Sequence, residues 1–288
     1  MAKLAFLGPV GTHSEAAAMH LAKLRGLDDA LCPYPDIFQV LEAVDRGDVD
    51  RALVPVENSM EGAVNITLDA LIKEQNLTVT AELIWGVHNQ LMAKPGHGEI
   101  RKVLSHVQPL SQCREYLSKH YPKAALVATA STSEAAREVG HSDVAEGLAA
   151  ICTRRAGELN DLVIVDEEIQ DSAANCTRFF EVRQKGVIFE PLPKNAPEKI
   201  LLICLIDGKR AGSLCDVLME FSKRDINMTH IESRPTRMEL GTYIFFFDIE
   251  PGDDERLLQE TIDSVEKKSI WLRVIGRFPV ISEDSGKG

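Results

Sequence analysis

The chain has 288 residues, 44% apolar and 26% charged, a composition typical of a folded globular protein long enough for two domains. Its 44 acidic side chains outnumber 32 basic ones, and the net charge of −12 disfavours a nucleic-acid partner because no local basic patch offsets it. The longest purely apolar run, residues 200–206, is far too short to span a membrane. The N-terminus has no secretory or transit pattern, so we expect a cytoplasmic protein.

Cysteine and histidine are scattered along the chain. No Cys-x-x-Cys pair and no His-Glu-x-x-His arrangement occurs in the sequence. Disulfides are improbable in a chain of this size and expected location. We therefore predict reduced, mostly buried thiols and no metal site.

Residues 1–189 alternate short strands with helices, which is typical of an α/β domain with mostly parallel strands. Apolar runs predict strands at residues 4–7, 52–56, 103–104, 126–129 and 162–165. The first strand leads through the turn 8–11 to Thr12 and Glu15, whose spacing is that of a helix capping box. A further helix is expected near residues 111–120.

Polar residues follow nearly every one of these strands, often where the next helix begins. Ser, Thr and Asn are also the preferred helix caps, so ordinary capping accounts for any single cluster. Ligands, however, bind outside the carboxyl ends of strands in open α/β sheets, and helix N-termini attract anions. The clusters together predict a site for a small carboxylate. No phosphate loop or Ser-His-Asp order is present, so spacing alone names no reaction.

Residues 190–198 contain three prolines and no apolar periodicity. This composition indicates a semi-rigid, extended linker between two domains. We expect the linker to carry any coupling between the sites of the two domains, either as a lever or as a tether.

Residues 199–282 are predicted to form a β-α-β-β-α-β unit, the ferredoxin-like arrangement. The expected strands are residues 200–206, 227–233, 242–249 and 270–278. Apolar residues of the two helices recur at the spacing of one helix face: Leu214, Val217, Leu218 and Phe221 in the first, and Leu258, Ile262 and Val265 in the second.

Four segments of the first domain resemble, in order, the motifs of the prephenate dehydratase family. They are residues 8–15 (GPVGTHSE), 54–59 (VPVENS), 105–113 (SHVQPLSQC) and 175–179 (NCTRF). Downstream, residues 212–214 (GSL) and 227–235 (NMTHIESRP) resemble a phenylalanine-sensing ACT domain. The resemblance covers essentially the whole chain.

This resemblance implies a two-lobed catalytic domain like the type II periplasmic binding proteins, with the substrate in the cleft. The implied reaction of phenylalanine biosynthesis converts prephenate to phenylpyruvate, without a cofactor and under feedback inhibition by L-phenylalanine. It is a 1,4-elimination driven by aromatisation, in which CO2 and the C4 hydroxyl leave. A proton donor at the C4 oxygen and an apolar setting for the departing carboxylate would assist it.

The family's catalytic threonine corresponds to Thr177, which we expect to donate a hydrogen bond or relay a proton to the leaving hydroxyl. Asn58, Ser105 and Gln112 complete the expected catalytic set as neutral donors. The resemblance implies further substrate-binding residues: Gly11, Thr12, Ser14, Glu57, Ser59, His106, Gln108, Ser131, Thr132, Asn175, Arg178 and Phe179. Arg178 either pairs with a substrate carboxylate or connects the two lobes. For Phe179, a place in the core is the preferred interpretation over a contact with the ligand.

Two positions depart from the family pattern. His13 stands where the family usually has an aromatic residue, and Val107 stands where it usually has proline. Valine removes the backbone restriction that proline would place on His106. The roles of His106 and Gln108 are therefore left open.

In the second domain the resemblance implies L-phenylalanine bound at an interface between two ACT domains. The implied residues are Gly212, Ser213, Leu214, Asn227, Met228, Glu232, Ser233, Arg234 and Pro235. The glycine turn lets the backbone approach the ligand's carboxylate at a helix start. Regulation and a merely structural dimerisation role both predict a homodimer or homotetramer, because a small sheet leaves a face or an edge to cover.

Two other functions remain open at this point. Arogenate, in which an amine replaces the keto group of prephenate, would undergo the same chemistry. A non-catalytic sensor of a carboxylate would use the same fold, although a pure binder has no need of the Thr177 hydroxyl. The products formed from each substrate discriminate between these alternatives.

Overall fold

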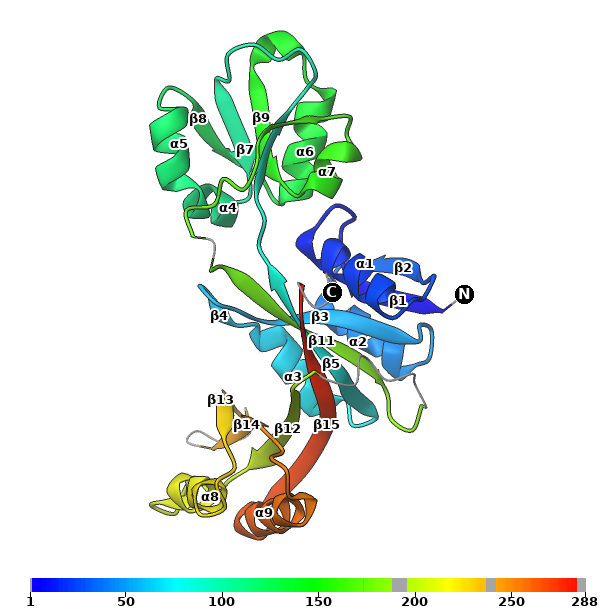
Figure 1. Cartoon of the computed structure of the whole chain (residues 1–288), viewed down its shortest axis with the longest axis vertical. Coiled ribbons are helices and arrows are strands. Elements are labelled where there is room, and N and C mark those ends of the chain that lie inside the picture. The colour runs from blue at the N-terminus through cyan, green and yellow to red at the C-terminus, as the bar shows by residue number, and fades with distance from the viewer. Residues whose placement is uncertain (1, 173, 188–195, 237–241, 284–288) are drawn as a thin grey trace.

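The computed structural model describes residues 2–172, 174–187, 196–236 and 242–283. The molecule has three parts along its long axis: two lobes formed by the first domain and a C-terminal domain. The first lobe, which contains the N-terminus, lies between the second lobe and the C-terminal domain (Figure 1). This α/β architecture of two lobes plus a small domain confirms the predicted fold class. Within the described ranges, no helix is both long and apolar enough to cross a membrane.

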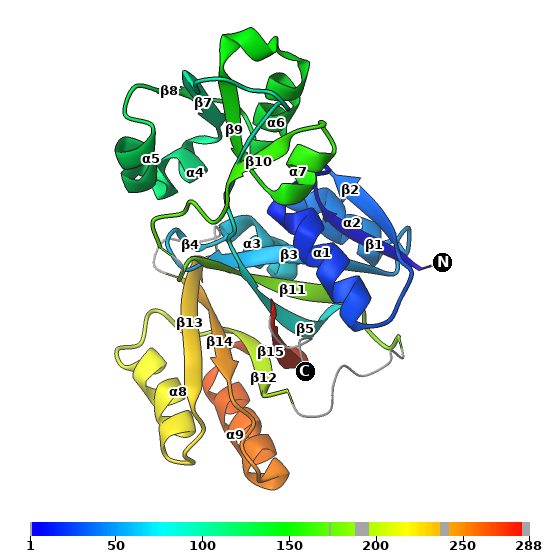
Figure 2. The same cartoon turned by 45° about the horizontal axis from the view of Figure 1, so that its top comes forward.

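The first lobe is a mixed sheet with helices on both faces (Figure 2). Its strands are β1 (Lys3–Leu7), β2 (Ala30–Tyr34), β3 (Arg51–Asn58), β4 (Gly62–Ala63), β5 (Leu77–Gly86) and β11 (Cys176–Gln184). Its helices are α1 (His13–Leu24), α2 (Ile37–Asp45) and α3 (Asn65–Lys73). Strands β1, β2 and β3 are parallel, whereas β11 lies antiparallel between β3 and β5. Helix α1 packs on one face, and α2 and α3 pack on the other.

The second lobe has its own smaller sheet, in the order β10-β6-β9-β7-β8. Its strands are β6 (Gln90–Ala93), β7 (Lys102–Ser105), β8 (Ala125–Ala128), β9 (Leu148–Cys152) and β10 (Val163–Asp166). Its helices are α4 (Val107–Gln112), α5 (Arg114–His120), α6 (Thr132–His141) and α7 (Arg154–Glu158), with a 3-10 turn η1 (Val144–Glu146). The chain enters this lobe after β5 and returns at β11, so two crossing segments connect the lobes.

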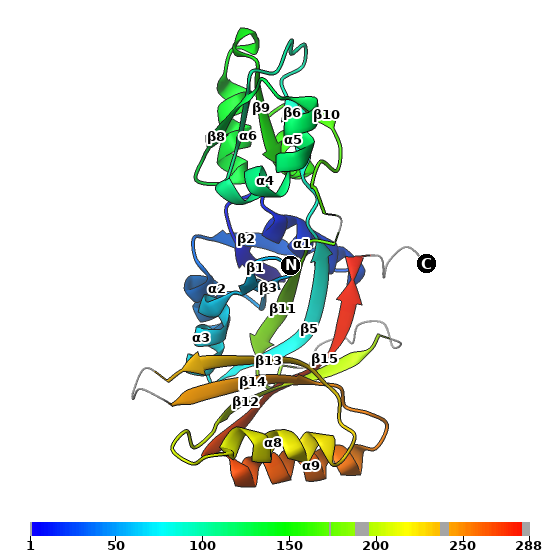
Figure 3. The same cartoon turned by 90° about the vertical axis from the view of Figure 1, so that its left-hand side faces the viewer.

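The C-terminal domain has the predicted βαββαβ order. Its elements are β12 (Glu198–Leu205), α8 (Ser213–Ser222), β13 (Met228–Pro235), β14 (Tyr243–Ile249), α9 (Glu255–Lys268) and β15 (Trp271–Ser282). Strand order is β13-β14-β12-β15, with every pair antiparallel. Helices α8 and α9 cover the face of this sheet that points away from the lobes (Figure 3). Their apolar residues face the sheet, as the sequence period predicts.

The opposite face of this sheet packs directly on the first lobe. Leu201, Ile203 and Phe246 of the C-terminal domain share one buried cluster with Val79 and Phe180 of the first lobe. Burying this face removes apolar surface from water, which stabilises the contact between the two domains.

The two sheets are also joined by backbone. The end of β15 pairs in parallel with β5, and Val280 lies opposite Glu82. Gly276 makes the approach possible, because a Cβ there would lie 2.1 Å from the carbonyl oxygen of Val79. One continuous sheet therefore runs from β13 of the C-terminal domain to β2 of the first lobe.

This junction changes two expectations. We expected the linker to carry the coupling between the sites of the two domains, but the shared core and the β15–β5 pairing offer another route. Most of the linker, residues 190–198, lies outside the described residues. Its last residue, Glu198, already belongs to β12. The sheet face that we expected a second copy to cover is covered by the chain's own first lobe. Within the described residues, strand β13 remains at the sheet edge and pairs with β14 alone.

Candidate active site and regulatory contacts

Polar side chains meet where β3 ends and β11 begins, directly after the chain returns from the second lobe. Thr177 lies opposite Asn58 in the ladder, and Asn58 Nδ2 donates to Thr177 Oγ1 over 3.1 Å. The same Nδ2 lies 3.1 Å from Asn175 Oδ1. Asn58 Oδ1 accepts from the backbone N–H groups of Met60 and Glu61 at 3.0 and 3.3 Å. These bonds fix the amide so that its N–H groups point at Thr177 and Asn175.

Neighbouring groups complete this end of the sheet. Ser59 exchanges two hydrogen bonds with Cys176, because its N–H donates to the Cys176 carbonyl at 2.9 Å and its Oγ accepts from the Cys176 N–H at 3.1 Å. Trp85 lies opposite Thr177 on β5. Trp85 Nε1 and Asn175 Nδ2 are buried donors with no hydrogen-bond partner within the described ranges. Buried donors normally find acceptors, so these two indicate a place for a ligand's oxygen atoms.

The second lobe contributes the other predicted donors. Ser105 ends β7, is fully buried, and donates its hydroxyl to a carbonyl oxygen of β9 at 2.7 Å. Gln112 ends α4, and its Oε1 accepts from Asn89 Nδ2 at 3.4 Å. Asn89 is fully buried in the segment that crosses between the lobes. Among the described side chains, no hydrogen bond joins Ser105 or Gln112 to Thr177 or Asn58, so the site has one half in each lobe.

The first turn of the chain forms a contact between the lobes. Thr153 Oγ1 donates to the Gly11 carbonyl at 2.7 Å. Gly11 has φ +86°, and a Cβ there would lie 3.0 Å from the side chain of Ala156, so glycine is needed. Thr12 caps α1 by accepting from the Glu15 N–H at 3.3 Å. Glu15 reaches back to the N–H of Gly11 instead of that of Thr12, one residue earlier than in the predicted capping box.

Other predicted binding residues act as helix caps. His106 Nδ1 accepts from the Gln108 N–H at 3.4 Å at the start of α4. Ser131 Oγ accepts from the Glu134 N–H at 3.0 Å at the start of α6. Ser131 also borders a cavity of about 770 Å³ between the first turn of the chain and helices α6 and α7. Two more predicted binding residues lie in first turns of helices: Ser14 in α1 and Thr132 in α6.

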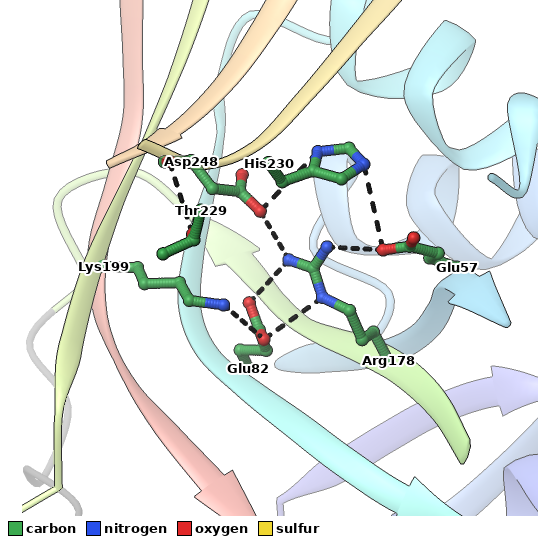
Figure 4. Close-up of polar contacts among 7 residues, drawn as sticks. All are labelled: Glu57, Glu82, Arg178, Lys199, Thr229, His230 and Asp248. Carbon is green, nitrogen blue, oxygen red and sulfur yellow. Dashed lines mark hydrogen bonds and ion pairs between the residues drawn. The ribbon is translucent and has the colours of Figure 1, made fainter. Parts of the chain in front are cut away.

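Arg178 and Glu57, expected among the substrate-binding residues, face the C-terminal domain instead (Figure 4). Arg178 Nε and Nη2 bind Glu82 at 3.1 and 2.8 Å, and Nη1 binds Glu57 at 2.7 Å. Arg178 Nη2 also binds Asp248 of β14 at 2.5 Å. Successive side chains of a strand point to opposite faces, so Arg178 points away from Thr177. Of the two roles considered for Arg178, the structural connection fits this geometry better than pairing with a substrate carboxylate. Arg178 connects the first lobe to the C-terminal domain, however, and not to the second lobe.

Phe179 lies on the same face of β11 as Thr177 and is 1% exposed. It packs in the cluster between the sheet and α1, together with Phe6 and Leu21. Phe179 therefore lies in the core, and its place among the substrate-binding residues stays a prediction.

The ion pairs around Arg178 shift the pKa values of its partners. Burial alone would raise the pKa of Glu82, but hydrogen bonds from Arg178 and Lys199 outweigh it and the pKa is lowered. Burial raises the pKa of Asp248, although Arg178 opposes the rise. Burial opposes the charge of Arg178, yet its hydrogen bond to Glu82 and the charge of Asp248 raise its pKa. The guanidinium is thus held charged in a buried place.

The residues expected to bind phenylalanine fall into two groups. Gly212, Ser213 and Leu214 border a cavity of about 320 Å³ together with Arg210 and Tyr243. Gly212 has φ +82° at the start of α8, which a side chain would disfavour. The other residues lie on or beside the edge strand: Asn227, Met228, Glu232, Ser233, Arg234 and Pro235. One chain alone therefore does not bring the set together.

Two members of the second group already have partners. Arg234 binds both carboxylate oxygens of Asp69 in α3, at 3.0 and 3.1 Å. Asn227 donates to Glu250 at 2.8 Å. Arg234 is therefore a second tie between the C-terminal domain and the first lobe.

Sequence analysis did not single out Trp85, Asn89, Glu82 or Asp248. A signal existed for the two carboxylates, because Asp248 is the one charged residue of an apolar strand and Glu82 is the one charged residue of a strand rich in apolar residues. Charged residues are almost never fully buried without a partner, so such a residue predicts an ion pair. No comparable signal marks Asn89.

A hydroxyl–amide pair at the end of the first lobe's sheet, with buried donors nearby, fits a site for a small ligand with oxygen acceptors in a two-lobed protein. The C-terminal βαββαβ domain, with its own cavity, adds the architecture of a regulatory domain. No group of three or more His, Cys, Asp or Glu side chains within the described ranges is placed to hold a metal ion.

Comparison with known proteins identifies the family. Residues 4–187 match the family model "Prephenate dehydratase", and residues 205–266 match the model "ACT domain". The chain is 36% identical over 286 residues to a prephenate dehydratase of Lactococcus lactis, covering 99% of this chain and 100% of that protein. It is 35% identical to a prephenate dehydratase of Methanocaldococcus jannaschii, covering 94% and 96%.

A solved structure gives the same result. The crystal structure of prephenate dehydratase in complex with L-Phe from Arthrobacter aurescens superposes with a TM-score of 0.84 at 30% identity, covering 99% of this chain and 91% of that one. The chain belongs to the prephenate dehydratase family, and its C-terminal domain is an ACT domain.

We expect His13 to make stability depend on pH. Burial, with a smaller effect of nearby His88, lowers the pKa of His13 from 6.5 to about 4, although the Asn89 side chain opposes this. Between these two values the unfolded chain binds a proton that the folded chain does not, so the free energy of unfolding decreases as pH falls from 6.5 towards 4. His13→Phe, which restores the aromatic residue usual in the family, should remove this part of the pH dependence.

The measurement is the Tm at pH 7.5 and at pH 5 for the wild type and the variant. A smaller Tm difference in His13→Phe than in the wild type is expected. His141→Phe, at an exposed histidine, serves as the control and should keep the wild-type difference. An unchanged difference in His13→Phe would show that His13 is not held neutral by burial.

Proposed function

We propose that this chain is a prephenate dehydratase that forms phenylpyruvate from prephenate with release of CO2 and water. One observation carries the proposal: the Thr177 hydroxyl is held by Asn58 at 3.1 Å, at the edge of the first lobe. Both residues lie inside the segment that matches the family model. Relatives named for this activity over nearly the whole chain support it.

The direction of the Thr177–Asn58 hydrogen bond suits a proton donor. Asn58 Nδ2 can only donate, so it occupies a lone pair of Thr177 Oγ1 and leaves the threonine O–H free to donate. That O–H would bind the C4 hydroxyl of the substrate as its C–O bond breaks. Asn58 would stabilise the charge that develops on Oγ1.

The electrons come from the bond to the departing carboxylate. As CO2 leaves the ring, that bond's electron pair moves into the ring, and the C4 oxygen departs as water after taking up one proton. The proton passes through the Thr177 hydroxyl and is replaced from solvent. The aromatic ring of phenylpyruvate is the driving force, so the protein needs only a donor and an orienting site.

Neutral donors are suited to holding the substrate. Among the described residues, Asn175 Nδ2 and Trp85 Nε1 lie near Thr177 without hydrogen-bond partners, and both would donate to a carboxylate or keto oxygen of the substrate. Neutral groups stabilise the ground-state carboxylate less than a cation would, so less of the binding energy opposes its departure. This also leaves Arg178 free for its ion pairs.

Arogenate remains the alternative substrate, because it carries an amine in place of the keto group and would undergo the same elimination. A non-catalytic sensor is the alternative function. Separate incubation of the purified protein with prephenate and with arogenate, followed by product identification, tests both. Phenylpyruvate from prephenate is expected; phenylalanine from arogenate alone would redirect the assignment, and no product from either would favour the sensor.

We expect Thr177→Ala to lower kcat for phenylpyruvate formation by about 10²- to 10⁴-fold, because the donor to the leaving oxygen is lost. Thr177→Ser keeps a hydroxyl and should retain most of the activity. Prephenate binding, measured by calorimetry, should change little in either variant. Wild-type turnover in Thr177→Ala would remove Thr177 from the mechanism.

We further propose that L-phenylalanine binds at the cavity bordered by Gly212, Ser213 and Leu214. The β13 residues that one chain leaves on the sheet edge would come from a second copy, which gives a homodimer or a homotetramer. The relative from Arthrobacter aurescens whose structure is in complex with L-Phe supports this ligand. Feedback inhibition would then require contacts between the ACT domain and the first lobe.

We expect millimolar L-phenylalanine to raise the Tm and to lower the dehydratase rate, because a ligand that binds only the folded state stabilises it. Gly212→Val should weaken both effects, since φ +82° disfavours a β-branched residue. Thermal shift and rate are measured on the same preparation, with D-phenylalanine as the control. No shift with a folded wild-type protein would reduce the ACT domain to a structural role.

A further inference from the structure

The Thr177–Asn58 pair stands at an end of the sheet where the register between β11 and β3 is irregular. The register of β11 and β3 shifts directly after Arg178, because Val56 is an extra residue in β3. Two ladder pairs continue beyond this bulge: Thr177 with Asn58, and Arg178 with Glu57. A bulge disrupts the ladder and increases the local twist. β11 keeps a regular register with β5 here, so the bulge affects only how β11 meets β3, which is the step that carries the Thr177–Asn58 pair.

The Arg178–Glu57 ion pair acts on this step. It joins β11 to β3 at 2.7 Å, one residue from the Thr177–Asn58 pair and on the opposite face of the sheet. A cross-strand ion pair of this kind favours one register. A shift of the Arg178 guanidinium would therefore act on the strand step that carries the Thr177–Asn58 pair.

The guanidinium is held from two further strands. Its side chain is 13% exposed and binds Glu82 of β5 through two nitrogen atoms. Asp248 of the ACT domain binds Nη2 from the other side (Figure 4). Removing one partner of a buried ion pair is costly because the remaining charge is left uncompensated.

Charge balance alone does not require Asp248. Two cations face three carboxylates in this cluster: Arg178 and Lys199, against Glu57, Glu82 and Asp248. His230 lies 3.8 Å from both Glu57 and Asp248. Burial raises the pKa of Asp248, so its placement opposes its own ionisation. Asp248 is thus a carboxylate in excess whose burial costs free energy. Its contact with Arg178 is better explained by positioning this guanidinium than by a gain in stability.

Strand β14 connects Asp248 to the regulatory cavity. Tyr243 and Phe245, near the start of the strand, border the cavity of about 320 Å³, and Asp248 lies near its end. Within the ACT sheet, β14 pairs with β12 on one side and β13 on the other. A shift of this strand against the first lobe would therefore move Asp248 relative to Arg178.

We propose that Asp248 of the ACT domain is a positioning residue for the dehydratase reaction, acting through Arg178 on the strand end that carries Thr177 and Asn58. The same contact carries the effect of a ligand in the regulatory cavity to the reaction site. This inference rests on the proposed dehydratase activity, since Asp248 itself does not contact the candidate reaction site.

Asp248→Asn tests the inference in the full-length protein, because it keeps the side-chain shape and removes the charge. We expect kcat to fall about tenfold and KM to change less than about twofold, as a small misplacement of a reacting group gives. Inhibition by L-phenylalanine should weaken while its binding, measured by calorimetry, persists. In a Thr177→Ala background Asp248→Asn should cause no further loss, because both act on one group.

Glu220→Gln is the matched control in the same domain. Glu220 is a buried carboxylate that pairs with Lys268 and Arg224 between α8 and α9, away from Arg178. The control should lower the Tm and leave kcat unchanged. Equal losses of kcat in both variants, or a wild-type kcat in Asp248→Asn, would overturn the proposal.

Two further measurements keep the outcome decisive. Glu57→Gln breaks the same connection inside the first lobe and should give the same fall in kcat; a wild-type kcat there would also overturn the proposal, even if Asp248→Asn failed to fold. Hydrogen exchange needs no substrate: residues 57–60 and 175–178 should exchange faster in Asp248→Asn than in Glu220→Gln. An inactive wild type would refute the proposed function alone, whereas unchanged exchange would refute the positioning role.

Discussion

The guanidinium of Arg178 is buried, and a buried guanidinium needs carboxylates close around it. The chain supplies them from Glu57 on β3, Glu82 on β5 and Asp248 on β14. Those three strands belong to two domains, so satisfying one side chain fixes the first lobe and the ACT domain against each other. The adjacent residue on β11 is Thr177, the proposed proton donor. The ion pairs of Arg178 therefore connect the junction between the two domains with the candidate reaction site at Thr177.

Other contacts at the junction act in the same direction. The apolar face of the ACT sheet shares a core with the first lobe, Arg234 binds Asp69, and β15 continues into the sheet of the first lobe beside β5. The effect of a ligand bound in the ACT cavity can therefore pass to the reaction site through these contacts, without the linker. The continuous packed sheet can transmit this effect, because its strands carry both sites. Such packing responds to small shifts by discrete rearrangement.

The sequence predicted what depends on local patterns. The βαββαβ order followed from apolar periods, and the Thr177–Asn58 pair came from motifs that the family shares. The motifs did not show that Glu57 and Arg178 face the ACT domain, because a motif is contiguous in sequence, whereas neighbouring residues of a strand face opposite sides. The pairing of β15 with β5 joins residues nearly two hundred positions apart and leaves no local signal. Burial of Glu82 and Asp248 inside apolar strands was visible, but their common partner was not.

The central claim is that the first lobe and the ACT domain form one cooperative body. The chain has two tryptophans, Trp85 in β5 and Trp271 in β15, so Trp85→Phe and Trp271→Phe each leave one fluorescent reporter, in the ACT domain and in the first lobe respectively. Urea unfolding of both variants should give coincident transitions, also by circular dichroism, because neither part is expected to unfold without the other. Separate transitions, with the ACT domain unfolding while the first lobe stays folded, would contradict the account.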